Sequence, residues 1–217
     1  MGVHVTAYWG ARRQLLATLG LVGIVVYVAI DILLAFLDPR YSLVVNAESD
    51  YGVGPNAWLM DANFLLRCAF SLAIAAAIWL ASPPGRRPRS GLVLLGVWAL
   101  ASGLLAFLPD NPVGSPATTS GSLHLLVASM AFLTLAAGVL LLSRRSSLDA
   151  WAGSTARILR PLAALVVVSV ALVLILAAVP RLGFGIGERV FLTAALAWLA
   201  AAAWAVRDLP LPSVGRP

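Results

Sequence analysis

Six long apolar runs, each of a length that can cross a lipid bilayer, follow one another along this chain of 217 residues. They cover residues 15–37, 58–80, 91–108, 123–142, 159–179 and 190–206. A transmembrane α-helix needs about 17–25 predominantly apolar residues. Breaks rich in proline and glycine, such as residues 82–85 and 109–116, are typical helix boundaries. The pattern predicts an all-α fold, in which residues 1–217 form one domain: a polytopic membrane protein with a six-transmembrane-helix bundle.

Composition excludes several other classes of protein. The chain is 61% hydrophobic and 11% charged, whereas soluble domains carry about 25% charged residues. The net charge is +6, but the fifteen basic residues are all arginines scattered over short loops. They form no basic stripe with interleaved aromatic residues, so we expect no nucleic-acid partner. One cysteine and two histidines are too few for a zinc site, and we expect neither a metal nor a cofactor.

The arginines also predict the orientation of the chain, because cytoplasmic loops of membrane proteins are enriched in basic residues. One side of the predicted bundle carries Arg12, Arg13, Arg86, Arg87, Arg89, Arg144, Arg145, Arg157, Arg207 and Arg216. The other side carries Arg40, Arg181 and Arg189. Ten arginines against three place both termini in the cytoplasm and the long loop of residues 38–57 outside. The absence of lysine suggests a GC-rich bacterial gene, and hence a multi-pass protein of the bacterial plasma membrane.

Polar side chains inside the apolar runs or immediately before them gather toward the predicted outer side. They are Asp31, Asp61, Asn63, Arg67, His124, Glu188 and Arg189. The inner halves of the runs are almost uninterrupted apolar sequence. An ionisable residue inside a membrane is costly and is by default a functional-site hypothesis. The sequence therefore predicts a polar site at the outer end of the bundle.

Asp31 and Arg67 are the two charges that lie deepest. At about 1.5 Å per helical residue, Asp31 lies about 10 Å inward of Asp38, and Arg67 lies about 9 Å inward of Asp61. The two depths match, so these residues could form an intramembrane ion pair if their helix faces meet. The pair could fix helix packing or could bind a substrate or ion. Arg67 could instead extend its side chain to the membrane interface.

Four segments resemble a known family. They are PRYSLVVNAESDYGVGPNAWLM at residues 39–60, FLPDNPVG at 107–114, GSLHLLVASMAF at 121–132 and GERVFLTAALAW at 187–198. Their order and spacing resemble the bacterial and archaeal membrane family called domain of unknown function 998. The residues that match its motifs are Tyr41, Ser42, Ser49, Asp50, Gly52, Asp110, His124 and Arg189. This chain differs at Tyr51, where the family often has an aliphatic residue, and at Leu108. The resemblance implies a six-helix fold and no established activity.

The first functional hypothesis is a lipid-facing site that binds or modifies a lipid or prenyl-type amphiphile. The candidate catalytic residues are His124, Asp110, Asp50 and Asp31. The candidate substrate-binding residues are Arg67, Arg189, Glu188, Asp61, Asn63, Ser49 and Tyr51. An enzyme of this kind would use acid–base chemistry, as a hydrolase or cyclase, with His124 as base or acid. Arg189 would hold an anionic head group, or Asp31 would protonate a prenyl chain.

Two other classes of function remain open. The protein could be a small transporter or proton relay, in which Asp31, Arg67 and Asp61 would line a polar path. It could also be a structural or accessory subunit that acts through a protein partner. In that case the charged groups would hold the outer loop against the bundle.

Overall fold

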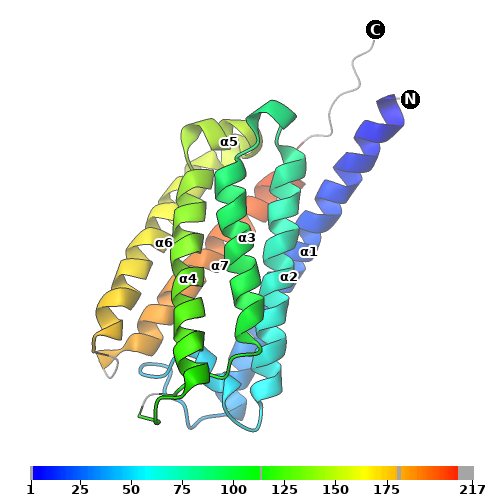
Figure 1. The fold of residues 1–217 in the computed structure, drawn as a ribbon. Coiled ribbons are helices and arrows are strands. Elements are labelled where there is room, and N and C mark those ends of the chain that lie inside the picture. Colours follow the sequence, from blue (N-terminus) through cyan, green and yellow to red (C-terminus); the bar gives the residue numbers. More distant parts are fainter. Residues whose placement is uncertain (1, 113, 180–181, 210–217) are drawn as a thin grey trace.

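The computed structural model describes residues 2–112, 114–179 and 182–209, and within these residues the protein is helical without any strand (Figure 1). Arg181 and Arg216, which enter the prediction of orientation, lie outside the described residues. The long helices are α1 Gly2–Leu37, α2 Ala57–Ala81, α3 Arg89–Leu105, α4 Thr119–Leu142, α6 Ala156–Ala177 and α7 Phe184–Arg207. The short elements are η1 Glu48–Gly52, η2 Pro84–Arg86, α5 Arg145–Trp151 and η3 Gly153–Thr155.

Five helical segments of the described chain are long and apolar enough to cross a membrane. They are Tyr8–Leu37, Ala57–Ala81, Thr119–Leu142, Gly153–Ala177 and Phe184–Arg207. Helix α3 is also apolar but has 17 residues. The fold is therefore that of a multi-pass α-helical membrane protein.

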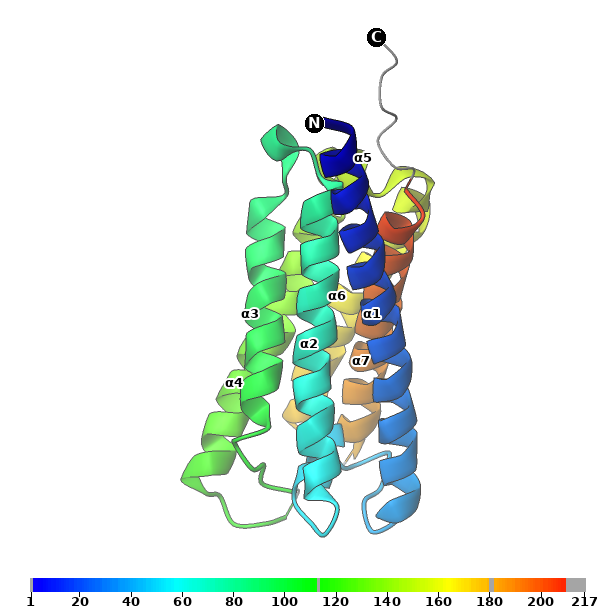
Figure 2. The same ribbon diagram turned by 90° about the vertical axis from the view of Figure 1, so that its right-hand side faces the viewer.

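The helices form one bundle in which neighbours in sequence are also neighbours in space. α1 packs on α2, α2 on α3, α3 on α4 and α6 on α7, while α7 also contacts α1 and α2. Figures 1 and 2 show that the first turns of α1 and the last turn of α7 lie at the same end of the bundle. The segments 38–56 and 106–112 lie at the opposite end, which we call the loop end.

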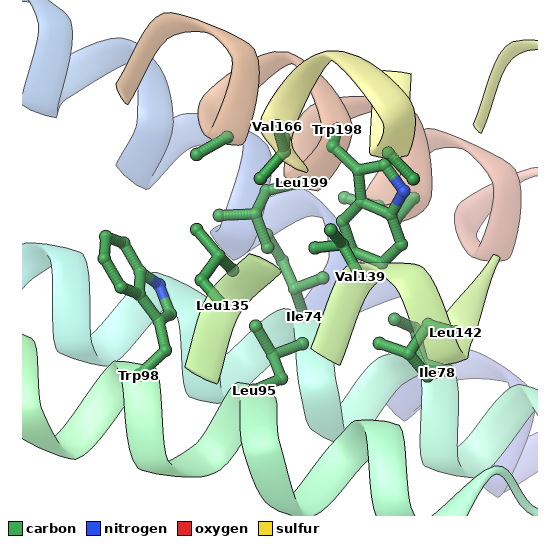
Figure 3. Packing of buried hydrophobic residues seen from close by; sticks show 14 of the residues in the cluster. Ile74, Ile78, Leu95, Trp98, Leu135, Val139, Leu142, Val166, Trp198 and Leu199 are labelled. Atoms are coloured by element: carbon green, nitrogen blue, oxygen red, sulfur yellow. The ribbon is translucent and has the colours of Figure 1, made fainter. Parts of the chain in front are cut away.

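Two buried tryptophans anchor the core between the helices (Figure 3). The indole Nε1 of Trp98 donates a hydrogen bond to Ser71 Oγ at 3.1 Å. The indole Nε1 of Trp198 donates to Ser143 Oγ at 3.0 Å. Both tryptophans are fully buried, and a buried indole N–H needs such an acceptor. Each bond joins two helix regions that are distant in sequence, so the core fixes how the helices are rotated.

The largest differences from the predicted boundaries are at the first helix, which begins at Gly2 and not at Leu15, and at the last helix, which begins at Phe184 and not at Val190. Glycine disfavours helix interiors, so the glycines at 183, 185 and 187 indicated a loop. In the structure a Cβ on Gly185 would lie 2.2 Å from the carbonyl oxygen of Asn46, and one on Gly187 would lie 2.7 Å from Leu176 Cδ1. These glycines allow close packing inside the helix, and packing outweighs propensity here.

Smaller differences occur elsewhere. Helix α3 ends at Leu105 and not at Leu108, because the chain turns there into the segment that leads to Pro109. The short helix α5 was not predicted, since its seven residues carry no long apolar pattern.

Candidate functional site

A pocket of about 360 Å³ opens at the loop end between α4, α6 and the start of α7. Its polar lining consists of Ser49, Asp50, Asp110, Asn111, Ser122, His124, Ser129 and Glu188. Its apolar lining consists of Ala47, Ala117, Gly121, Leu125, Ala128, Phe132, Leu133, Val170, Val173, Leu174, Ala177 and Phe184. From His124 to Leu133 the wall extends about 13 Å along α4. The pocket thus has a polar mouth and a long apolar wall.

The pocket opens on an apolar flank of the bundle. Three of its lining residues, Leu125, Leu133 and Leu174, are half exposed or more. Exposed leucines on a membrane-spanning helix contact lipid chains, because no water is present at that depth. An apolar chain could therefore enter the pocket sideways from the bilayer.

His124 is the central residue of the mouth and is 3% exposed. Its Nδ1 lies 2.6 Å from the carbonyl oxygen of Leu108. A carbonyl can only accept a hydrogen bond, so Nδ1 carries the hydrogen. In the neutral ring, Nε2 then has a free lone pair. This nitrogen is buried, has no hydrogen-bond partner among the described residues, and lies 3.5 Å from Asp110 Oδ2. It can therefore accept a proton or a hydrogen bond from a ligand.

Asp110 connects the histidine to the long loop. Its Oδ2 accepts a hydrogen bond from Ser49 Oγ at 2.5 Å, and its Oδ1 accepts one from the backbone N–H of Asn111 at 2.7 Å. The hydrogen of the Ser49 hydroxyl is thus directed to Asp110 and not to His124. The arrangement holds a carboxylate beside the imidazole, where it can stabilise an imidazolium.

Asp50 is the second acid of the mouth. Its Oδ2 accepts a hydrogen bond from Asn46 Nδ2 at 2.7 Å. Burial raises the pKa of Asp50 from 3.8 to about 6, and the nearby charge of Asp110 adds to this rise. The hydrogen bond from Asn46 and the charge of Arg189 oppose it. Asp50 therefore changes its charge near pH 6.

The raised pKa of Asp50 predicts a pH dependence of stability. The folded protein holds the Asp50 proton up to about pH 6, whereas the unfolded chain releases it near pH 4. The contribution of Asp50 to the free energy of unfolding is fully present below about pH 4. It is lost as the pH rises through about 6, and the loss is at most about 3 kcal/mol. Thermal unfolding between these pH values should show a steeper fall in Tm for wild type than for Asp50→Asn. Equal slopes in the two proteins would contradict the assignment.

A second polar cluster, the Arg67 cluster, lies inside the bundle beside the mouth. We define it as Arg67, Tyr27, Glu48 and Glu188. Arg67 is 2% exposed, and its Nη1 donates a hydrogen bond to Tyr27 Oη at 3.1 Å. Tyr27 donates in turn to Glu48 Oε1, and the backbone N–H of Glu48 donates to Glu188 Oε2 at 2.6 Å. Glu188 belongs to this cluster and to the pocket lining, so it joins the two.

Aromatic rings surround the guanidinium of Arg67. Its Cζ lies 5.0 Å from the ring centre of Trp98, 5.1 Å from that of Phe64 and 5.7 Å from that of Tyr27. Such cation–π contacts stabilise a buried cation. Burial and the negative charge of Asp31 raise the pKa of Glu48, while Arg67 opposes that rise.

Asp31 does not form an ion pair with Arg67 in the structure, although both residues are described and lie at similar depth. Arg67 bonds to Tyr27, while Asp31 Oδ1 is buried without a hydrogen-bond partner. Arg189 Nη1 donates to the carbonyl oxygens of Asn46 at 2.8 Å, Leu43 at 3.2 Å and Gly185 at 3.2 Å. Arg189 therefore holds the long loop against α7.

The structure divides the predicted site residues into two groups. Lining the pocket are Ser49, Asp50, Asp110, His124 and Glu188. Outside its lining are Asp31, Tyr51, Asp61, Asn63, Arg67 and Arg189. Asn63 lies beside the Arg67 cluster, where its Nδ2 donates to the carbonyl oxygen of Tyr27 at 3.3 Å. Asp61 is partly exposed near the start of α2.

Sequence reasoning missed Asn111 and the α4 side of the pocket. Ser122, Leu125, Ser129 and Leu133 follow one another at steps of three or four residues. That spacing places them on one face of a helix. The two serines on this otherwise apolar face could have indicated from the sequence that it lines a polar site.

The fold and the pocket define the class of protein: a multi-pass α-helical membrane protein with a polar-mouthed pocket at one end. The family model described as "Protein of unknown function (DUF998)" matches residues 21–205. The chain belongs to this family, as its motifs predicted. The matched region contains all residues that line the pocket. No curated protein and no solved structure matches the chain.

Proposed function

We propose that the pocket binds a single-chain amphiphile, a lipid or prenyl-type molecule taken up from the membrane. Its head group would lie at His124, Asp110 and Ser49, and its chain along the apolar wall between α4 and α6. The observation that carries this proposal is the combination of a buried polar mouth with an apolar wall that opens among exposed leucines. A uniformly packed loop end would offer no such space.

The volume of the pocket favours one chain over two. Small-molecule pockets commonly have volumes of about 300–1,000 Å³, and this pocket, at about 360 Å³, lies near the lower limit. A two-chain lipid would leave one chain outside, in the bilayer. The ligand is therefore a single acyl, alkyl or prenyl chain with a small head.

We further propose that the bundle has six spans with both termini in the cytoplasm of a bacterial cell. Helix α3 has 17 mostly apolar and small residues in total, about 25 Å of helix, and runs beside α2 and α4 (Figures 1 and 2). The beginning of α1 and the end of α7 lie at one end, as an even number of spans requires. The arginine distribution makes that end cytoplasmic. The pocket would then open to the outer leaflet.

The histidine also gives the pocket a capacity for proton transfer. His124 Nε2 could take a proton from a hydroxyl or amine that the ligand itself carries, and Asp110 would stabilise the imidazolium. Ser49 is not arranged as a nucleophile that His124 activates, because its hydroxyl donates to Asp110. Any catalysis at this site would thus be acid–base chemistry on the ligand.

Native mass spectrometry with lipid extraction tests the proposal on protein purified in polymer discs from its own membrane. Leu133→Trp places an indole in the pocket and should reduce the retained amphiphile about tenfold or more. Leu140→Trp is the matched control, because Leu140 lies on the same helix, is 49% exposed against 50% for Leu133, and does not line the pocket.

Equal retention in wild type and Leu133→Trp, or no retained amphiphile in either, would contradict the proposal. In that case a protein that co-purifies with the wild type would point to the alternative function as an accessory subunit.

A further inference from the structure

Acidic side chains dominate the mouth of the pocket. The charged or titratable side chains that line it are Asp50, Asp110, Glu188 and His124, and none of the described lining residues is an arginine. Carboxylates accept hydrogen bonds and bind cations. A phosphate or carboxylate head at this position would face three acids without a compensating cation.

The histidine adds a fourth acceptor. Its Nδ1 hydrogen is used by the carbonyl of Leu108, so the neutral ring presents the lone pair of Nε2. This nitrogen is buried and unpartnered within the described chain, and the residue lines the pocket. An unpaired buried acceptor costs free energy unless a donor reaches it. The ligand head is therefore expected to supply a hydrogen-bond donor.

Two arginines near the loop end, Arg189 and Arg67, contact other groups. Arg189 Nη1 donates to three backbone carbonyls of the long loop and α7. Arg67 donates to Tyr27 and lies among aromatic rings. Neither lines the pocket. Arg189 Nε and Nη2 have no hydrogen-bond partner among the described residues, but an anion in the mouth would meet no guanidinium in the pocket lining.

A positive head would also relieve the repulsion among the acids. Asp50 and Asp110 line the same pocket, and the charge of Asp110 adds to the rise in the pKa of Asp50. An ammonium between them would lower the free energy of their charged forms, since opposite charges attract strongly in a poorly hydrated site. It carries three donors for the acceptors of the mouth.

We propose that the pocket selects a single-chain amphiphile with a protonated primary amine head, in preference to a neutral or anionic head on the same chain. The inference rests on the proposed function, and it names the class of ligand for that pocket. The ammonium would donate to His124 Nε2 and to the carboxylates of Asp110 and Asp50.

A competition experiment with three probes of equal chain length tests this selectivity. The full-length protein in phosphatidylcholine nanodiscs is incubated with dodecylamine, 1-dodecanol and dodecyl phosphate together, and bound probes are counted by native mass spectrometry. Retention is scored as the difference between wild type and Leu133→Trp, which removes non-specific partition into the disc. Dodecylamine should exceed dodecyl phosphate about tenfold or more, and its retention should rise between about pH 5 and pH 7 as Asp50 loses its proton.

Variants of the acids make the test specific. Asp50→Asn and Asp110→Asn, which remove the two carboxylates that would accept hydrogen bonds from the ammonium, should each reduce dodecylamine retention at about pH 7 several-fold, with little effect on 1-dodecanol. Asp61→Asn removes the same charge at the loop end but outside the pocket lining, and it should leave retention unchanged. If one of the pocket variants does not fold, the other still decides the outcome.

Each result separates the two proposals. Preference for dodecyl phosphate or equal retention of the three probes, with a difference between wild type and Leu133→Trp, would overturn the amine selectivity and leave the amphiphile site intact. No difference between wild type and Leu133→Trp for any probe would contradict the pocket itself. Reduced retention in Asp61→Asn equal to that in Asp50→Asn would assign the effect to surface charge, and would overturn the inference.

Discussion

Arg67→Ala is expected to lower the free energy of unfolding by about 3–5 kcal/mol, the usual cost of removing one partner of a buried charge network. The guanidinium is the cation that stabilises Glu48 through Tyr27, and it fills the space among the Trp98 and Phe64 rings. Its loss leaves a buried carboxyl and a cavity at once. Unfolding titrations in mixed micelles, read by tryptophan fluorescence, measure the loss directly.

Two further variants test the physical reason. Arg160→Ala removes an arginine that is exposed on α6, and its effect should stay within about 0.5 kcal/mol. The double variant Arg67→Ala with Glu48→Gln removes both charges, so it should be more stable than the sum of the two single variants predicts. Strict additivity would show that Arg67 acts by packing and not through Glu48.

Gly185→Ala should destabilise the protein by about 1–3 kcal/mol or more, the usual cost of overpacking. The added methyl group would lie 2.2 Å from the carbonyl oxygen of Asn46 and 2.9 Å from that of Leu43. Both are backbone atoms of the long loop, so the loop must move away from α7. Limited proteolysis should then cut residues 38–56 faster, and Tm should fall.

Gly96→Ala is the matched control, because a Cβ at Gly96 in α3 meets no atom within 4 Å. There the substitution should stabilise the helix by up to about 1 kcal/mol. Opposite signs at the two glycines are the expected result. A loss of stability at both positions, of similar size, would show that the loop contact is not the cause.

The sequence predicted the helical membrane fold well because long apolar runs have few alternative structures. It also predicted that His124, Asp110 and Asp50 belong to one end of the bundle, since each lies between two runs or at the start of a run on that side. The rotation of each helix about its axis could not be predicted from the sequence. Asp31 and Arg67 share a predicted depth, but in the structure Arg67 donates to Tyr27 and its guanidinium lies beside the ring of Trp98 on α3.

The apolar wall of the pocket could not be predicted for a related reason. Val170 and Val173 on α6 are ordinary apolar residues in an apolar run, and only their placement opposite α4 makes them part of a pocket. The glycines at the start of α7 made the predicted start of this helix wrong. A propensity argument treats them as helix breakers, whereas the structure uses them to bring the loop close.

The hydrogen bond between the backbone of Glu48 and the side chain of Glu188 joins residues 140 positions apart. During synthesis, the segment that contains Glu48 emerges from the ribosome long before α7 is synthesised. During synthesis and membrane insertion the nascent chain must therefore keep this acidic segment without its final partner, until the last helix enters the bilayer. The mouth of the pocket is completed last, so a chain that is truncated before α7 is expected to carry an open loop end that membrane proteases can recognise.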